Sequence, residues 1–218
     1  TRGLITCDNW TPNLVNYMKK SKTTELKTEE NPIKFAVICP HKNDVIYTQA
    51  ALSIMVQAKH AAKLFFYGPA TVSMAFVRNN LIENFLKSDC THALCLDGDE
   101  VFPENMVYKL LNHNKDIVSA YVCVKNQPEK PNAYVKHKGK YIPYKGVGLE
   151  EVDAVGFGNI LIKREVFEKM GSPWFAYEDS KTKVTTEEIY FFEKAKKLGY
   201  KLFVDFGLRC EHLSLRAI

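Results

Sequence analysis

The 218-residue sequence is poor in glycine and proline, with 11 and 9 residues, which excludes collagen-like and linker-dominated architectures. No apolar run approaches the ~20 residues that a membrane-spanning helix needs, so we expect no membrane span. Hydrophobic residues make up 46% of the chain and charged residues 25%, which predicts a buried core and excludes global disorder. The net charge of +5 is compatible with an anionic substrate but does not demand nucleic acid.

Several well-known catalytic motifs are also absent. The sequence has no glycine-rich phosphate loop, no HExxH zinc motif and no GxSxG nucleophile elbow. Its six cysteines form no CxxC pair, and Cys39, Cys95 and Cys123 lie in apolar β-like runs, where a free thiol behaves as a small hydrophobe. This favours reduced thiols and a cytoplasmic location over a disulfide framework. Because the chain starts without Met or a signal-peptide core, we expect a trimmed, processed or fragmentary chain.

The polar residues 1–32 are expected to form an N-terminal arm or linker, and residues 33–218 one domain. Strand-like and helix-like segments alternate in this domain. Strands are expected at 33–39, 64–67, 93–96, 117–124, 152–162 and 200–204, and helices at 49–62, 77–86, 103–111, 165–170 and 186–198. The alternation predicts an α/β fold with a mostly parallel central sheet and helices on both faces. The basic, Tyr-rich residues 125–149 are expected to form a hairpin or long loop outside it.

The strongest chemical signal is an acidic cluster, Asp97-Gly98-Asp99-Glu100, directly after the apolar run 93–96. Ligands of open α/β sheets bind outside the carboxyl ends of the strands. Two carboxylates this close repel each other unless a cation lies between them, and a hard ion such as Mn²⁺ or Mg²⁺ also coordinates phosphate oxygens. The alternative is an Asp-Gly turn that carries ordinary surface acids.

Two further residues fit such a site. Arg78 begins the helix before this strand, and its guanidinium could bind two oxygens of a diphosphate. His212 follows the last strand and could complete the metal site as a neutral imidazole. The alternatives are a solvated arginine on a helix surface and a lone exposed histidine.

The order of these residues along the chain is similar to that in GT-A glycosyltransferases, and closest to compact viral, phage and bacterial members of the family-2-like group. The resemblance covers about residues 33–213 and rests on an ordered set of motifs: Arg78-Asn79, Leu96-Asp97-Gly98-Asp99, Val152 to Gly158 with Leu161 to Arg164, Pro173-Trp174-Phe175, Thr186-Glu187-Glu188, and Asp205 with Cys210-Glu211-His212.

The resemblance implies a GT-A fold, a nucleotide-sugar donor that is often UDP-linked, and Mn²⁺ or Mg²⁺ as cofactor. Asp99 and His212 would bind the metal, while Asp97 would bind the metal or the hydroxyls of the ribose or sugar. The remaining donor-site residues would be Pro40, Lys42 and Asp44 beside the nucleoside, Arg78 against the donor, and Gly156 and Gly158 where the backbone approaches the sugar. Trp174 would offer an aromatic face to the acceptor, or else be a core aromatic.

The same resemblance makes Glu188 the general base, with Glu187 as the next candidate. The family usually shows Glu-Asp at these two positions, so the carboxylate here is one methylene longer. A single base implies inversion at the anomeric carbon. If no carboxylate reaches the acceptor, a retaining mechanism is the alternative. Without the family, Thr185 and Glu188 have the spacing of a capping box, with Thr185 as N-cap.

The acceptor is open: a glycan is favoured, and modified DNA is compatible with the lysines. A second hypothesis is a non-catalytic module that binds a nucleotide, a glycan or nucleic acid, and a third is a nucleotidyltransferase. The second rests on alternating basic and aromatic residues, which can hold single-stranded nucleic acid, namely Lys125, Lys130, Lys136, Lys138, Lys140 and Lys145 with Tyr134, Tyr141 and Tyr144. The sequence leaves the oligomeric state open.

Overall fold

A seven-stranded sheet organises residues Lys34–Ile218, one of the two units into which the chain divides; the other is Thr1–Ile33. The strand order is β10 (Leu149–Val152), β15 (Leu202–Arg209), β5 (Ile117–Tyr121), β12 (Asn159–Lys163), β3 (His92–Leu96), β1 (Phe35–Pro40) and β2 (Lys63–Tyr67). The computed structural model describes residues 33–41, 46–67, 72–180 and 183–213. The predicted arm at 1–32 and the predicted donor-site residues Lys42 and Asp44 lie outside these described residues.

Five of the seven strands run in one direction. Strand β1 is parallel to β2 and β3, and β15 is parallel to β5. Strand β12 is antiparallel to both β3 and β5, so these two share a direction, and β10 is antiparallel to β15. The predicted α/β fold with a mostly parallel sheet is confirmed, and the reversals of β12 and β10 are features that the apolar pattern did not indicate.

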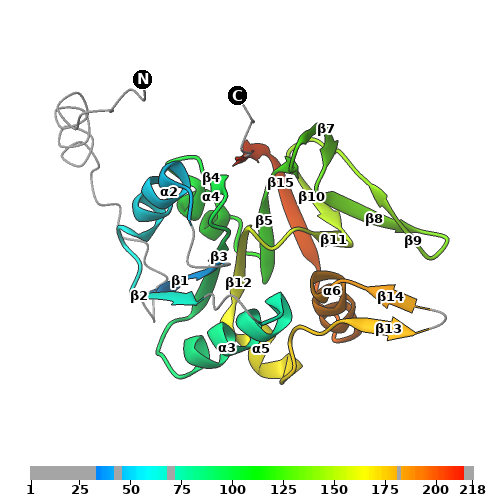
Figure 1. Ribbon diagram of the computed structural model, residues 1–218, viewed down its shortest axis with the longest axis horizontal. Helices are drawn as coiled ribbons and strands as arrows, with labels where there is room; N and C mark the ends of the chain where they lie inside the picture. Colours follow the sequence, from blue (N-terminus) through cyan, green and yellow to red (C-terminus); the bar gives the residue numbers. More distant parts are fainter. Residues whose placement is uncertain (1–32, 42–45, 68–71, 181–182, 214–218) are drawn as a thin grey trace. The chain divides into compact units, whose positions relative to one another are not determined.

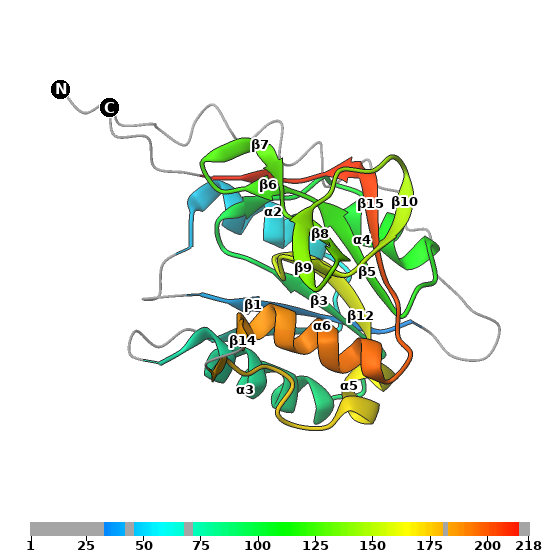
Figure 2. The ribbon, with the colours of Figure 1, turned by 90° about the vertical axis from the view of Figure 1, so that its right-hand side faces the viewer.

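Helices cover both faces of the sheet (Figures 1 and 2). Helices α2 (Thr48–Ala58) and α4 (Met106–Asn112) lie on one face, and α3 (Met74–Leu86), α5 (Arg164–Met170) and α6 (Glu187–Lys197) on the other. Helix α3 begins three residues earlier than predicted because the Ser73 side chain accepts a hydrogen bond from the Phe76 N–H at 3.3 Å and caps it. No helix within the described ranges is long and apolar enough to cross a membrane.

The core between the sheet and helices α3, α5 and α6 is rich in aromatic residues. Phe157 lies at its centre, with ring centroids 4.9 Å from both Phe175 and Phe191, in edge-to-face geometry. Helix α6 contributes Phe191, Phe192 and Ala195 to this core, whereas Leu198, which follows the helix as its C-cap, is exposed. These rings fix the loop before β12 against α6, which positions the acidic residues at the start of that helix.

Short strands complete the carboxyl edge of the sheet. Strand β4 (Glu100–Val101) pairs with β16 (Glu211–His212), so the end of the described chain lies beside the acidic cluster. The basic segment forms the predicted irregular region as hairpins: β6 (Cys123–Val124) pairs with β7 (Gln127–Pro131), and β8 (Ala133–His137) pairs with β9 (Lys140–Pro143) and β11 (Ala154–Val155). A last hairpin, β13 (Glu178–Ser180) with β14 (Lys183–Thr185), precedes α6.

Candidate functional site

The acidic cluster lies where the chain leaves β3 at the carboxyl edge of the sheet. The Asp97 N–H donates to the Gly158 carbonyl at 2.9 Å, which extends the β3–β12 pairing by one residue. Glu100 is 2% exposed and accepts a hydrogen bond from the Asn159 side chain at 2.9 Å. Burial, followed by the charge of Asp97, raises the pKa of Glu100 to about 8, and burial raises the pKa of Asp97 as well. The cluster is therefore a site of crowded, poorly solvated carboxylates and not an exposed Asp-Gly turn.

Asp99 lies between two basic groups. Its Oδ1 is 3.6 Å from His212 Nε2, and its Oδ2 accepts a hydrogen bond from Lys125 Nζ at 2.6 Å. Burial alone would raise the pKa of Asp99, but His212 and Lys125 outweigh it and lower the pKa to about 2. For His212, burial opposes the charge, yet Asp99 and the Cys123 carbonyl raise the pKa to about 9. The structure thus brings the predicted pair Asp99 and His212 together, and adds Lys125.

Arg78 is buried at the centre of the site, with 6% of its surface exposed. One terminal nitrogen lies 3.4 Å from Glu188 Oε1 and 3.8 Å from Asp97 Oδ1, and Nε lies 3.8 Å from Glu187 Oε1. The guanidinium also lies over the Phe157 ring, 5.1 Å from its centroid. Its Nε makes no hydrogen bond with the described residues. The residue is therefore a buried cation shared by three carboxylates, not the solvated helix-surface arginine of the alternative interpretation.

Glu187 and Glu188 begin α6, but not as a capping box. The N-cap is Thr186, whose hydroxyl oxygen accepts a hydrogen bond from the Ile189 N–H at 3.3 Å, so the prediction of Thr185 as N-cap was wrong by one residue. Glu188 turns away from the cap: its Oε1 accepts the Phe157 N–H at 3.1 Å. Burial raises the pKa of Glu188 to about 7 against the opposing charge of Arg78. A carboxylate with this pKa can exchange a proton near neutral pH.

A cleft of about 310 Å³ opens beside these groups. It is lined by Pro40, His41, Tyr47, Met74, Arg78, Asp97, Gly98 and Asp99. Pro40, Arg78, Asp97 and Asp99 were predicted from the sequence as site residues, whereas Tyr47 and Met74 were not. The carboxyl ends of β1 and β3 thus frame the cleft, as expected for a ligand site of an open α/β sheet.

The two predicted glycines have a packing reason. A Cβ at Gly158 would lie 2.5 Å from Glu100 Oε1 and 2.9 Å from Asp97 Oδ2, and a Cβ at Gly156 would lie 2.1 Å from Asn132 Nδ2. Gly158 therefore makes room for the acidic cluster. The predicted approach of a sugar to this backbone stays a prediction.

Trp174 is in the core, where the structure departs from its prediction as an acceptor platform. The residue is 5% exposed, and its indole Nε1 donates to the Phe167 carbonyl at 2.8 Å. A buried, hydrogen-bonded indole offers no open face to a ligand, so Trp174 corresponds to the alternative interpretation of a core aromatic.

Much of the basic, Tyr-rich segment is partnered inside the chain. Lys136 Nζ lies 2.7 Å from Glu193 Oε1, which also accepts a hydrogen bond from the Tyr141 hydroxyl at 3.2 Å. The Tyr144 hydroxyl donates to Glu150. These contacts neutralise charge and fix the rings, which weakens the hypothesis of a nucleic-acid-binding row.

Lys125 is the main residue that sequence reasoning missed. It was counted among the basic residues of the hairpin, but nothing in the spacing linked it to Asp99, 26 positions earlier. Its ammonium also lies 5.4 Å from the centroid of the Tyr47 ring, across the cleft wall. Only the pairing of the strands reveals this contact.

The donor chemistry at the acidic cluster fits a divalent cation. Asp97, Asp99 and His212 offer carboxylate oxygens and an imidazole, which suit Mn²⁺ and Mg²⁺. Burial, followed by the charges of neighbouring carboxylates, raises the pKa values of Glu100 and Glu188. The ionised carboxylates of the cluster provide the negative charge that a cation would neutralise. As placed, however, no group of three or more His, Cys, Asp or Glu in the described ranges is arranged to hold an ion. Lys125 occupies one oxygen of Asp99.

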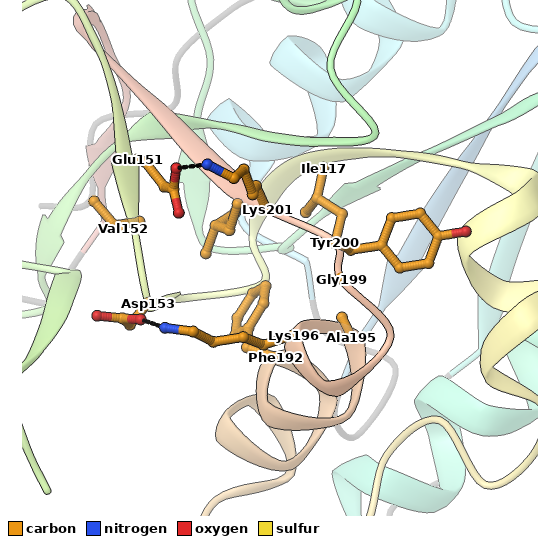
Figure 3. A pocket seen from close by; sticks show the side chains of 11 residues that line it. Ile117, Glu151, Val152, Asp153, Phe192, Ala195, Lys196, Gly199, Tyr200 and Lys201 are labelled. Atoms are coloured by element: carbon orange, nitrogen blue, oxygen red, sulfur yellow. Dashed lines mark hydrogen bonds and ion pairs between the residues drawn. The ribbon is translucent and has the colours of Figure 1, made fainter.

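A second, smaller pocket of about 180 Å³ lies at the opposite edge of the sheet, beside the first residues of β5 and β15 (Figure 3). Its acidic side chains each face one lysine: Glu151 pairs with Lys201 at 2.8 Å, and Asp153 pairs with Lys196. None of the predicted site residues lines this pocket.

The strand order, the two helical layers and the acidic carboxyl edge define a GT-A-like α/β fold. The structure is similar to the crystal structure of A197 from STIV, with a TM-score of 0.64 and 22% identity over 84% of this chain and 87% of that one. It is also similar to GalNAc-T7 solved with UDP, GalNAc and Mn²⁺, with a TM-score of 0.55 and 12% identity over 85% of this chain. The match spans only 45% of the GalNAc-T7 chain. No family model and no curated protein sequence matches this chain.

Proposed function

We propose that the chain is a metal-dependent glycosyltransferase that moves a sugar from a nucleotide-sugar donor to an acceptor hydroxyl. The observation that carries the proposal is that predicted residues meet at one cleft: Arg78, Asp97 and Asp99 line it. Behind them, His212 contacts Asp99, and Glu188 contacts Arg78. The likeness to a protein solved with UDP, GalNAc and Mn²⁺ supports a UDP-linked donor.

Asp99 and His212, with Asp97, would hold the Mn²⁺ or Mg²⁺ ion. When bound, the ion stabilises the negative charge that develops on a departing nucleoside diphosphate. Asp97 also faces the Arg78 guanidinium at 3.8 Å, so its second role in the proposal is to orient hydroxyls of the ribose or sugar. Pro40, with the loop that contains Lys42 and Asp44, would flank the nucleoside.

Glu188 is the proposed base. Arg78 and the Phe157 N–H hold its Oε1 at 3.4 and 3.1 Å, which fixes the orientation of the carboxylate. In the transfer step, the acceptor oxygen forms a bond to the anomeric carbon while the bond to the diphosphate oxygen breaks, and the acceptor proton passes to Glu188. A single displacement of this kind inverts the anomeric configuration. Glu187, which is 8% exposed, is the second candidate.

A glycan is the proposed acceptor. Modified DNA is less favoured because Lys125 and Lys136 are held by carboxylates of the same chain. The five described cysteines, Cys39, Cys90, Cys95, Cys123 and Cys210, are free thiols, which accords with the proposed cytoplasmic location.

A thermal-shift panel of nucleoside diphosphates, each with and without Mn²⁺, tests the proposal. A ligand that binds only the native state raises the midpoint of unfolding, so we expect one nucleotide to do so most strongly when Mn²⁺ is present. The corresponding nucleotide sugar should then release its nucleoside diphosphate in a metal-dependent assay. Stabilisation without any turnover would favour the binding module, and release of pyrophosphate would identify a nucleotidyltransferase.

A further inference from the structure

Lys125 occupies the position at Asp99 where a cation would bind. The two oxygens of Asp99 each face one basic group: Oδ1 lies 3.6 Å from His212, and Oδ2 lies 2.6 Å from the Lys125 ammonium. A metal ion needs lone pairs on these same oxygens. The ammonium therefore already supplies the positive charge that a divalent ion would bring.

The contact is built into the hairpin and does not come from a loose side chain. Lys125 lies at the turn between β6 and β7, where Asn126 takes a left-handed backbone conformation with φ of 59°, which asparagine tolerates better than most residues. The same hairpin orients the imidazole, because His212 Nδ1 donates to the Cys123 carbonyl at 3.1 Å. The Lys125 ammonium also lies over the Tyr47 ring, 5.4 Å from its centroid.

The cleft wall beside Asp99 also carries a second basic group. Arg78 lines it with 6% of its surface exposed, and its Nε lacks a hydrogen-bond partner among the described residues. That nitrogen is buried and lies 3.8 Å from Glu187 Oε1, so the contribution of Arg78 to the cleft is the positive charge of its guanidinium. Lys125 is half-buried, with 36% of its side chain exposed, so it can leave Asp99 for solvent when an ion arrives.

We propose that Lys125 and the divalent cation compete for Asp99, so that Lys125 is a positioning residue that weakens metal binding to the empty cleft. This inference rests on the proposed function, because it assumes that Asp99 is a metal ligand. It adds a regulatory role for the hairpin: the ammonium holds the acidic cluster together until a metal ion displaces it.

The test measures binding of Mn²⁺ alone, without nucleotide, from the electron paramagnetic resonance signal of the free ion. Lys125→Gln removes the competing charge and should tighten Mn²⁺ binding about tenfold, which corresponds to about 1.4 kcal/mol and lies in the range for a close charge pair near the surface. Lys125→Arg keeps the charge and should bind Mn²⁺ within about threefold of the unmodified chain. Lys130→Gln is the matched control, because Lys130 is an exposed lysine of the same hairpin.

Asp99→Asn, made alone and together with Lys125→Gln, separates the two claims. If Mn²⁺ binding depends on Asp99 but Lys125→Gln binds no tighter than Lys130→Gln, the competition is overturned and the proposed metal site stands. If Asp99→Asn leaves Mn²⁺ binding unchanged in both backgrounds, the metal site itself is overturned, and the competition with it. Tighter binding in Lys125→Gln that is lost in the double variant supports both.

Discussion

Two pockets among the described residues lie at opposite ends of the strands of one sheet and differ in how their charges are balanced. At the edge where β5 and β15 begin, Glu151 and Asp153 each pair with one lysine ammonium, and Asp153 also accepts the Lys136 N–H at 2.6 Å. At the carboxyl edge of β1 and β3, the buried Arg78 is shared by Asp97, Glu187 and Glu188.

This difference in charge distinguishes the candidate site from the second pocket. One-to-one pairs at the surface leave no charge to be satisfied by a ligand, and they contribute little to stability. At the cleft, one buried cation is shared by several carboxylates, and the pKa values of some of these carboxylates are raised. Their charge is not fully balanced within the chain, so a bound ligand or ion can balance it. Both pockets are hollows in the surface, but only at the cleft lined by Arg78 does one buried cation face several carboxylates.

The largest expected effect breaks the acidic cluster. Asp99→Ala should lower kcat/KM for sugar transfer about 10³-fold, because it removes the carboxylate that would hold the ion. Glu151→Ala, at the other pocket, should leave transfer within about twofold, since the Glu151–Lys201 pair is partly exposed. Circular dichroism of both variants checks that the fold is kept. Equal activity of the two variants would contradict the metal role of Asp99.

Next in size is the loss of the proposed base. Glu188→Gln should lower kcat about 10²-fold with little change in KM, because proton transfer by a positioned carboxylate contributes at least that much. Glu188→Asp shortens the side chain to the residue that the resembled family usually carries, and should retain more activity than Glu188→Gln. Should Glu187→Gln prove the more damaging change, the base would be reassigned to Glu187.

The pH dependence of transfer gives a third, smaller effect. Glu188 must be ionised to accept a proton, and burial raises its pKa to about 7. The groups that face it are Arg78, which opposes this rise, and Glu187 and Asp97, which add to it. Hence kcat should increase from pH 5.5 to 8 with a midpoint near the pKa of Glu188. A flat profile over that range, measured at saturating donor and Mn²⁺, would exclude this carboxylate as the base.

The smallest effect concerns stability. Gly158→Ala places a methyl group 2.5 Å from the Glu100 carboxylate, which cannot move cheaply because it is buried and bonded to Asn159. Overpacking of this kind should lower the free energy of unfolding in urea by about 1–3 kcal/mol. For comparison, Gly148→Ala meets no atom within 4 Å and should cost only the backbone strain of its φ of 67°, about 1 kcal/mol. Equal losses would show that the Gly158 neighbours relax.

Local signals in the sequence were sufficient for much of the site. The apolar run 93–96 followed by Asp97 and Asp99 predicted a strand that ends in acids, and the structure has β3 there. Long-range pairing was not readable: β16 brings His212 to Asp99, and the β6–β7 hairpin brings Lys125. A pattern of residue types records which positions are apolar, but not which strands become neighbours.

Single residues show the same limit. Trp174 is an aromatic residue of the kind that stacks on sugars, yet its indole is buried against Phe167. Burial depends on what packs over a residue and not on its type. For Thr185 and Glu188, the capping spacing was present in the sequence, but the competing cap at Thr186 and the pull of Arg78 on Glu188 decided the outcome.

Because Arg78 is shared, changes at Asp97 and at Glu188 are thermodynamically coupled. The guanidinium lies within 4 Å of Asp97 and of Glu188, so neutralising either acid strengthens the hold of Arg78 on the other. The free-energy changes of Asp97→Asn and Glu188→Gln will therefore not add in the double variant. A substitution at Asp97 therefore changes which substitutions are tolerated at Glu188, and the reverse. The single buried Arg78 side chain is enough to cause this epistasis.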